Sequence, residues 1–116
     1  MNKMLERNTK LAVTALAMMV LLACGGLSEA EEYNNQGVDF ADSGDFETAI
    51  ASYSTAIELD RDYAMAYNNR GQAYYSLEQY DKALVDITRV IELDPNDKEA
   101  IEIREWLLQE HPELKE

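Results

Sequence analysis

The stretch that decides the fold runs from Ala64 to Pro95, with the sequence AMAYNNRGQAYYSLEQYDKALVDITRVIELDP. Much of this sequence has already appeared once, earlier in the chain. YNNQG at 33–37 returns as YNNRG at 67–71, and IELD at 57–60 returns as IELD at 91–94, so both pairs have the same separation. A self-match at a fixed period indicates a repeat architecture, in which each unit buries its apolar face against its neighbours.

The residues at fixed positions of this period resemble those of the tetratricopeptide repeat, a helix–turn–helix unit of about 34 residues. In the second copy the matching residues are Tyr67, Gly71, Tyr74, Ala83, Ile87 and Pro95. In the first copy they are Tyr33, Gly37, Phe40, Ala49 and Tyr53. The copies depart from the family pattern at Arg61, which replaces proline, and at Gln36 and Arg70, which replace leucine. The resemblance implies an all-α solenoid with repeats at about 30–63 and 64–97.

Apolar residues at helical spacing predict five helices, at about 29–43, 46–59, 63–77, 80–93 and 97–110. Ser28 with Glu31, and Asn96 with Glu99, match the capping box that begins a helix. The glycine inside the first helix of each repeat predicts close approach of the partner helix at its small alanine, Ala49 in the first repeat. Because Glu105 takes that glycine's place in the last helix, we expect a capping helix there and a loose tail at 112–116.

The segment 1–23 has the pattern of a bacterial lipoprotein signal peptide. Lys3, Arg7 and Lys10 precede an uncharged run at 11–22, which is too short to span a bilayer comfortably. The run ends in LLAC at 21–24, which resembles a lipobox and implies that Cys24 is lipidated and becomes the new N-terminus. Two alternatives stay open: Cys24 is an ordinary thiol behind a signal anchor, or cleavage falls later in the chain.

The lipobox implies a lipid-anchored envelope protein, in which residues 24–28 form a short tether and 29–111 the repeat domain. In double-membraned bacteria, an aspartate directly after the lipidated cysteine resembles an inner-membrane retention signal. This chain has Gly25 at that place, so we expect an anchor in the outer membrane, facing the periplasm. Cleavage leaves 22 acidic and 7 basic residues, a net charge of −15, so the lipid and not charge must hold the chain at an anionic membrane. The same acidity argues against nucleic acid, whose phosphates require a basic face.

In tetratricopeptide repeats the first helix of each repeat lines a concave groove, and the resemblance assigns this face to residues between the core positions. These are Asn34, Val38, Ala41 and Asp42, then Met65, Asn68, Gln72, Tyr75 and Ser76, and Glu99, Glu102 and Trp106 in the capping helix. Asn34 and Asn68 are either amides that hold a peptide backbone or merely part of the common repeat text. Trp106 is either an anchor for a partner or a cover for the end of the short core, and we favour the cover.

Chaperone-binding members of the family hold a C-terminal carboxylate with lysine, asparagine and arginine side chains. In this chain Val38, Glu99 and Ile103 stand at three of those places, and only Asn69 fits. We therefore expect the groove to take a neutral or basic peptide instead of an acidic one.

No motif in the sequence indicates an enzyme, a cofactor or a metal site. His111 is interpreted as a surface residue, and Asp42, Asp45 and Glu47 lack the spacing of a calcium loop. The sequence therefore predicts a non-enzymatic, membrane-anchored adaptor that binds another envelope protein. The alternative is a structural protein that self-associates, since two repeats and a cap are few and a homodimer would bury more surface.

Overall fold

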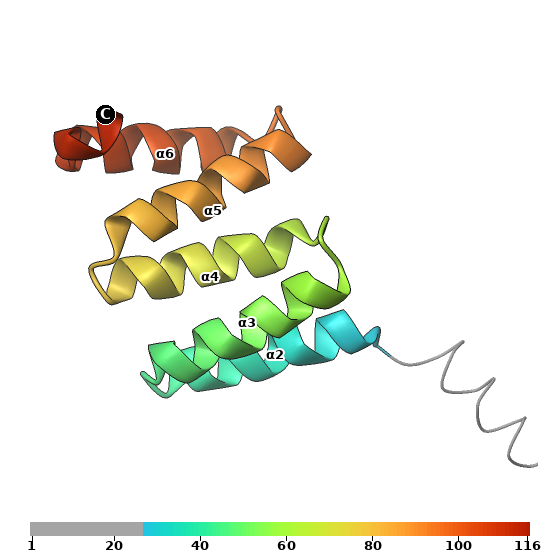
Figure 1. Ribbon diagram of the computed structural model, residues 1–116. Coiled ribbons are helices and arrows are strands. Elements are labelled where there is room, and N and C mark those ends of the chain that lie inside the picture. Colours follow the sequence, from blue (N-terminus) through green and yellow to red (C-terminus); the bar gives the residue numbers. More distant parts are fainter. Residues whose placement is uncertain (1–26) are drawn as a thin grey trace, which may run out of the picture.

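The computed structural model describes residues 27–116, which fold into five α-helices and one short 3₁₀ helix. They are α2 (Glu29–Asp42), α3 (Phe46–Leu59), α4 (Ala64–Ser76), α5 (Tyr80–Leu93), α6 (Lys98–Glu110) and η1 (Pro112–Lys115). Each helix packs on the next, so the chain stacks into a solenoid from α2 to α6 (Figure 1). None of these helices is long and apolar enough to cross a membrane. The predicted all-α solenoid is confirmed, whereas the signal segment and Cys24 lie outside the described residues.

Short polar caps begin α2 and α6. The predicted capping box is present at α2, where the Glu31 N–H donates to Ser28 Oγ at 3.2 Å and the Ser28 N–H donates to Glu31 Oε2 at 2.7 Å. The box predicted from Asn96 is wrong by one residue. Asp97 Oδ1 accepts from the Ala100 N–H at 3.0 Å instead, because an aspartate in extended conformation directly before the helix reaches its first free N–H groups.

The turns inside the two repeats share a backbone shape but not a residue type. Gly44 has a φ of 83°, and Glu78, which holds the equivalent place in the second repeat, has a φ of 58°. The left-handed region is open to glycine but costs a residue with a Cβ roughly 1–2 kcal/mol. Packing of the second repeat therefore prevails over the local preference of Glu78. After α6 the tail predicted to be loose forms η1, because Pro112 fixes φ at a helical value.

The two helices of each repeat approach closely at a glycine. A Cβ on Gly37 would lie 2.5 Å from Cε1 of Tyr53, and a Cβ on Gly71 would lie 3.3 Å from Cβ of Asp86. The close approach predicted from these glycines is confirmed. In the first repeat, however, the facing group is the Tyr53 ring and not Ala49.

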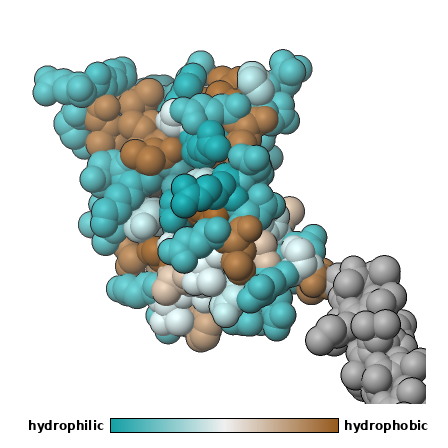
Figure 2. All heavy atoms as spheres, turned by 45° about the vertical axis from the view of Figure 1, so that its right-hand side comes forward, coloured by the Kyte–Doolittle hydropathy of each residue, from teal (hydrophilic) through white to brown (hydrophobic). Residues whose placement is uncertain are grey.

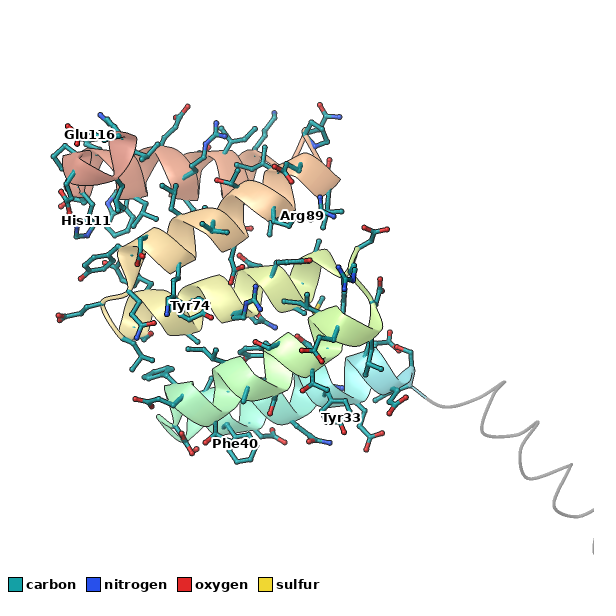
Figure 3. The ribbon with its side chains drawn as sticks, viewed as in Figure 1. Tyr33, Phe40, Tyr74, Arg89, His111 and Glu116 are labelled. Atoms are coloured by element: carbon teal, nitrogen blue, oxygen red, sulfur yellow. The ribbon has the colours of Figure 1, made fainter. Side chains whose placement is uncertain are left out.

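Apolar residues, most of them alanine, fill the interior in three clusters. Their buried members are Ala49, Tyr53 and Ala73; Ala56, Ile57 and Ala66; and Ile87, Val90 and Ala100. Phe40 stands at one of the fixed repeat positions, which are core positions in the family, but it is 38% exposed, and Figure 3 shows its ring pointing away from the helices. Its counterpart Tyr74 is half-buried because α3 packs beside α4, whereas no helix among the described residues precedes α2.

Candidate binding groove

An apolar hollow of about 350 Å³ lies between α4 and α6, with α5 as its floor. We call it the apolar pocket; it is lined by Asn68, Gly71, Gln72, Tyr75 and Ser76 of α4, Ala83 and Ile87 of α5, and Ile103, Trp106 and Leu107 of α6. None of these residues is charged, so the pocket suits an apolar side chain of a partner. Figure 2 shows a largely hydrophilic surface on which apolar residues gather in patches, several of them at the height of α5 and α6.

A second hollow of about 190 Å³ continues the groove toward the N-terminal ends of α4 and α6. It shares Asn68 and Ile103 with the apolar pocket and adds Ala64, Met65, Val90, Asp97, Glu99 and Ala100. We call it the acidic end. Within residues 27–116, neither Asp97 nor Glu99 has a lysine, arginine or histidine nitrogen within 4 Å. The groove thus has an apolar middle and a negative end.

Aromatic rings support the opposite end of the groove. The ring centroids of Tyr75 and Trp106 are 5.6 Å apart, and those of Tyr75 and Tyr80 are 5.3 Å apart. Tyr80 stacks on His111 at 3.7 Å and 23°, and Figure 3 places His111 where the end of α6 meets the start of α5. His111, interpreted as a surface residue, keeps 21% of its side chain exposed, and its ring completes this cluster. Desolvation and the nearby Glu78 carboxylate raise the pKa of Tyr80.

The structure brings all five α4 residues predicted for the groove to its wall. They are Met65, Asn68, Gln72, Tyr75 and Ser76. Trp106 joins them and is 46% exposed, so the favoured interpretation of Trp106 as a cover for the core is wrong. Its neighbour Leu107 takes the buried place, and one step along a helix turns Trp106 toward α4. Glu99 lines the acidic end, whereas Glu102 is exposed outside both hollows.

The first-repeat half of the predicted groove is closed by packing. Val38 and Ala41 are partly buried and contact the cluster of Ala49, Tyr53 and Ala73. Because α2 contacts α4 directly, these side chains fill the space in which a ligand would lie. Asp42 is exposed and lines neither hollow.

Asn34 was predicted as a groove residue and is instead 1% exposed. Its Oδ1 accepts a hydrogen bond of 3.0 Å from Asn69 Nδ2, which joins α2 to α4. The repeated asparagines therefore have different roles, since Asn34 bridges two helices and Asn68 lines the groove. Asn69, the one residue that fitted a carboxylate clamp, is engaged in this bridge.

One buried ion pair was not evident from the repeat pattern. Arg70 donates to both oxygens of Asp86, each at 2.8 Å, and to Ser54 Oγ at 3.1 Å. The guanidinium lies 5.7 Å and 5.8 Å from the ring centroids of Tyr67 and Tyr74. Hydrogen bonding to Asp86 raises the pKa of Arg70 and outweighs the lowering by burial. The pair ties α3, α4 and α5 together beneath the groove.

One of the three acidic residues without calcium-loop spacing has a structural role. Asp45 Oδ1 accepts from the Thr48 N–H at 3.1 Å and caps α3. Over residues 27–116, no three histidine, cysteine, aspartate or glutamate side chains gather into a metal-binding group.

Comparisons with known proteins find similarity to tetratricopeptide repeats in both sequence and structure. Family models described as "TPR repeat" and "Tetratricopeptide repeat" match residues 37–78 and 64–97. The second TPR of Spaghetti (RPAP3), bound to the HSP90 peptide SRMEEVD, is 28% identical with a TM-score of 0.69, over 76% of this chain and 82% of that one. No curated protein matches the sequence significantly.

Two further solved structures are similar over a smaller share of their own length. The first TPR of Spaghetti, also bound to SRMEEVD, is 30% identical with a TM-score of 0.66, over 70% of this chain and 64% of that one. The TPR2B domain of yeast Sti1 in complex with pHsp70 is 28% identical with a TM-score of 0.64, over 68% of this chain and 63% of that one. The chain thus spans less than two thirds of these two domains.

Proposed function

We propose that this protein is a non-enzymatic adaptor that holds a segment of another protein in the groove between α4 and α6. The support is a TPR-like helical solenoid in which residues 37–97 match models of the tetratricopeptide repeat. Folds of this type typically serve as interaction modules, and the two Spaghetti domains are bound to peptides. The observation that carries the proposal is the groove itself. Trp106 and Tyr75 form an exposed aromatic wall over a floor of Ala83 and Ile87. Partly exposed aromatic residues beside an apolar pocket are the usual anchors of protein interfaces.

We propose that the ligand differs in charge from the peptide of the relatives. SRMEEVD, to which both Spaghetti domains are bound, carries more acidic than basic side chains. Here the groove ends at Asp97 and Glu99, while Val38 and Ile103 stand where a clamp would need polar donors. Like charges repel across an interface, so a neutral or basic segment fits better.

We further propose that the adaptor is a lipoprotein of the bacterial envelope, anchored through Cys24 in the outer membrane and facing the periplasm. The support is the sequence of residues 1–24, with its positive start, short apolar run and LLAC end. Two or three acyl chains hold a protein stably at a bilayer. Only Gly25 to Leu27 separate Cys24 from the cap of α2, so the groove would work close to the lipid.

The anchor and the adaptor role are tested separately. Cys24→Ser should abolish lipid processing and shift the chain out of the membrane fraction, and unchanged processing and fractionation would reject the anchor. For the adaptor role, cells expressing the chain are treated with a cross-linker and its partners are identified by mass spectrometry. Tyr75→Ser with Trp106→Ala should lose the specific partner, whereas exposed Val85→Ala on α5 serves as the matched control and should keep it.

Self-association is the second candidate function, and one observation favours it. Phe40 projects from the outer face of α2 and is 38% exposed. The equivalent face of α4 is covered by α3, but no described helix covers this face of α2. A second copy covering this face would make a homodimer. Sedimentation of the protein separates the two ideas, because a strict monomer at high concentration rejects self-association and a Phe40→Ser variant that dissociates a dimer supports it.

A further inference from the structure

We propose that the groove recognises an extended segment in which one large apolar side chain and one lysine or arginine stand three positions apart. This inference rests on the proposed function and assigns the chemistry of its ligand. The apolar side chain occupies the apolar pocket, and the basic side chain reaches Asp97 and Glu99 at the acidic end.

The apolar pocket accepts one bulky side chain. Its volume of about 350 Å³ exceeds the volume of a single amino-acid residue. The ring of phenylalanine or the side chain of leucine therefore fits, with room for the adjoining backbone. Ala83 and Ile87 form the floor, and the tilted rings of Tyr75 and Trp106, with centroids 5.6 Å apart, form a wall. Since no charged side chain lines the pocket, a charged ligand group there would lose its hydration without compensation.

The acidic end supplies charge complementarity. Asp97 uses Oδ1 to cap α6, and no basic nitrogen among residues 27–116 lies within 4 Å of Asp97 or Glu99. Beside them Met65 and Ala64 give an apolar surface for the methylene stem of a lysine or arginine. The described residues as a whole are strongly acidic, which further attracts a basic segment.

The distance between the two hollows sets the spacing in the ligand. The α4 residues that line the apolar pocket run from Asn68 to Ser76, and those that line the acidic end run from Ala64 to Asn68. The midpoints of these two stretches of α4 are six residues apart, or about 9 Å at roughly 1.5 Å per residue of helix. An extended peptide covers about 10 Å in three residues. Asn68 lines both hollows, and its amide can donate to and accept from the backbone between the two side chains.

Trp106 provides the readout, because it is the only tryptophan in the chain and lines the apolar pocket. Capped peptides of sequence GSFGSKGS and, for the opposite direction, GSKGSFGS are titrated into the purified full chain while Trp106 fluorescence is recorded. The controls replace the phenylalanine by alanine, replace the lysine by glutamate, or place the two side by side. We expect saturable binding in at least one direction, and a loss of about tenfold or more in affinity for each control, since a buried Phe and a charge pair near the surface contribute on that scale.

Asp97→Asn with Glu99→Gln is the matched protein variant, because Asn keeps the cap of α6. It should bind the lysine and glutamate peptides within about twofold of each other while the dependence on phenylalanine remains. If the phenylalanine peptides bind but lysine and glutamate versions are equal in the unmodified protein, the inference is overturned and the adaptor function stands. If no peptide changes Trp106 fluorescence saturably up to about millimolar concentration, both the inference and the groove as the binding site are rejected.

Discussion

The buried pair of Arg70 and Asp86 should behave as a unit in the stability of the domain. The first repeat suggests the variants to make, because Gln36 and Ser52 hold the places that Arg70 and Asp86 hold in the second repeat. Arg70→Gln and Asp86→Ser therefore install residues that the same fold already accepts at those places. The matched set is the two single variants and the double variant.

The magnitude follows from the geometry of the pair. Asp86 is 2% exposed and accepts two hydrogen bonds of 2.8 Å. The Arg70 side chain is 19% exposed, and its guanidinium lies 5.7 Å and 5.8 Å from the centroids of two tyrosine rings. Removing one partner of a buried pair costs about 3–5 kcal/mol, because the other charge remains without compensation. Arg70 keeps some access to water, so we expect about 3 kcal/mol for Asp86→Ser and about 4 kcal/mol for Arg70→Gln. The double variant removes both charges and should cost about 1 kcal/mol.

Urea unfolding followed by far-ultraviolet circular dichroism gives the free energy of unfolding of each variant. A coupling energy of several kcal/mol between the two substitutions is the expected result. Single variants that each cost under about 1 kcal/mol, with effects that add, would show that the pair does not join α3, α4 and α5 as described.

Three further predictions concern the backbone and the core. Gly37→Ala should destabilise the domain by roughly 1–2 kcal/mol in urea unfolding, because the new Cβ would lie 2.5 Å from the Tyr53 ring. Gly71→Ala should cost less, because its Cβ would lie 3.3 Å from Cβ of Asp86. Equal costs for the two variants would contradict this prediction. Glu78→Gly should stabilise by about 0.5–1 kcal/mol by relieving a φ of 58°, whereas Gly44→Ala should destabilise; a loss of stability in Glu78→Gly would refute the strain. Burial raises the pKa of Tyr53 above 10.0, so the stability that its neutral phenol contributes is present below pH 10 and falls as the pH rises further. Tyr53→Phe should flatten this fall in urea midpoints measured from pH 8 to 11. An unchanged fall would contradict the assignment to Tyr53.

The repeat sequence was sufficient to predict the helices and their order. α3 and α5 begin and end at the predicted residues, because a cap or turn stands directly beside an apolar stripe at helical spacing. The family's fixed positions also predicted the close approach at Gly37 and Gly71, which depends only on contacts within one repeat.

The errors arise where a residue depends on contacts between repeats or on the end of the stack. Asn34 and Asn68 have the same place in their repeats, but α4 lies against Asn34 and the open groove against Asn68. Phe40 and Trp106 are both exposed, because Phe40 has no preceding described helix and Leu107 takes the core place beside Trp106. Periodicity within a repeat contains no information about these differences.

The ion pair left one signal in the sequence that could have identified it. Asp86 stands on the same face of its helix as Ala83, Ile87 and Val90, which are buried. A carboxylate on an apolar face requires a partner, and Arg70 is a departure from the family pattern in the facing helix. Together, these two features predict a contact between Arg70 and Asp86.

The most direct test of the account is photo-cross-linking from a single position in intact cells. A photoreactive amino acid is placed at Gln72, in the wall of the apolar pocket, and in a second strain at Val85, which is 68% exposed on α5 and outside the groove. If the groove is the binding site, position 72 should give a discrete adduct with one envelope protein. This adduct should be absent from position 85 and should be lost when Trp106 is replaced by alanine. Identical adducts from both positions, or an adduct only from position 85, would contradict the claim that the groove between α4 and α6 is the binding site.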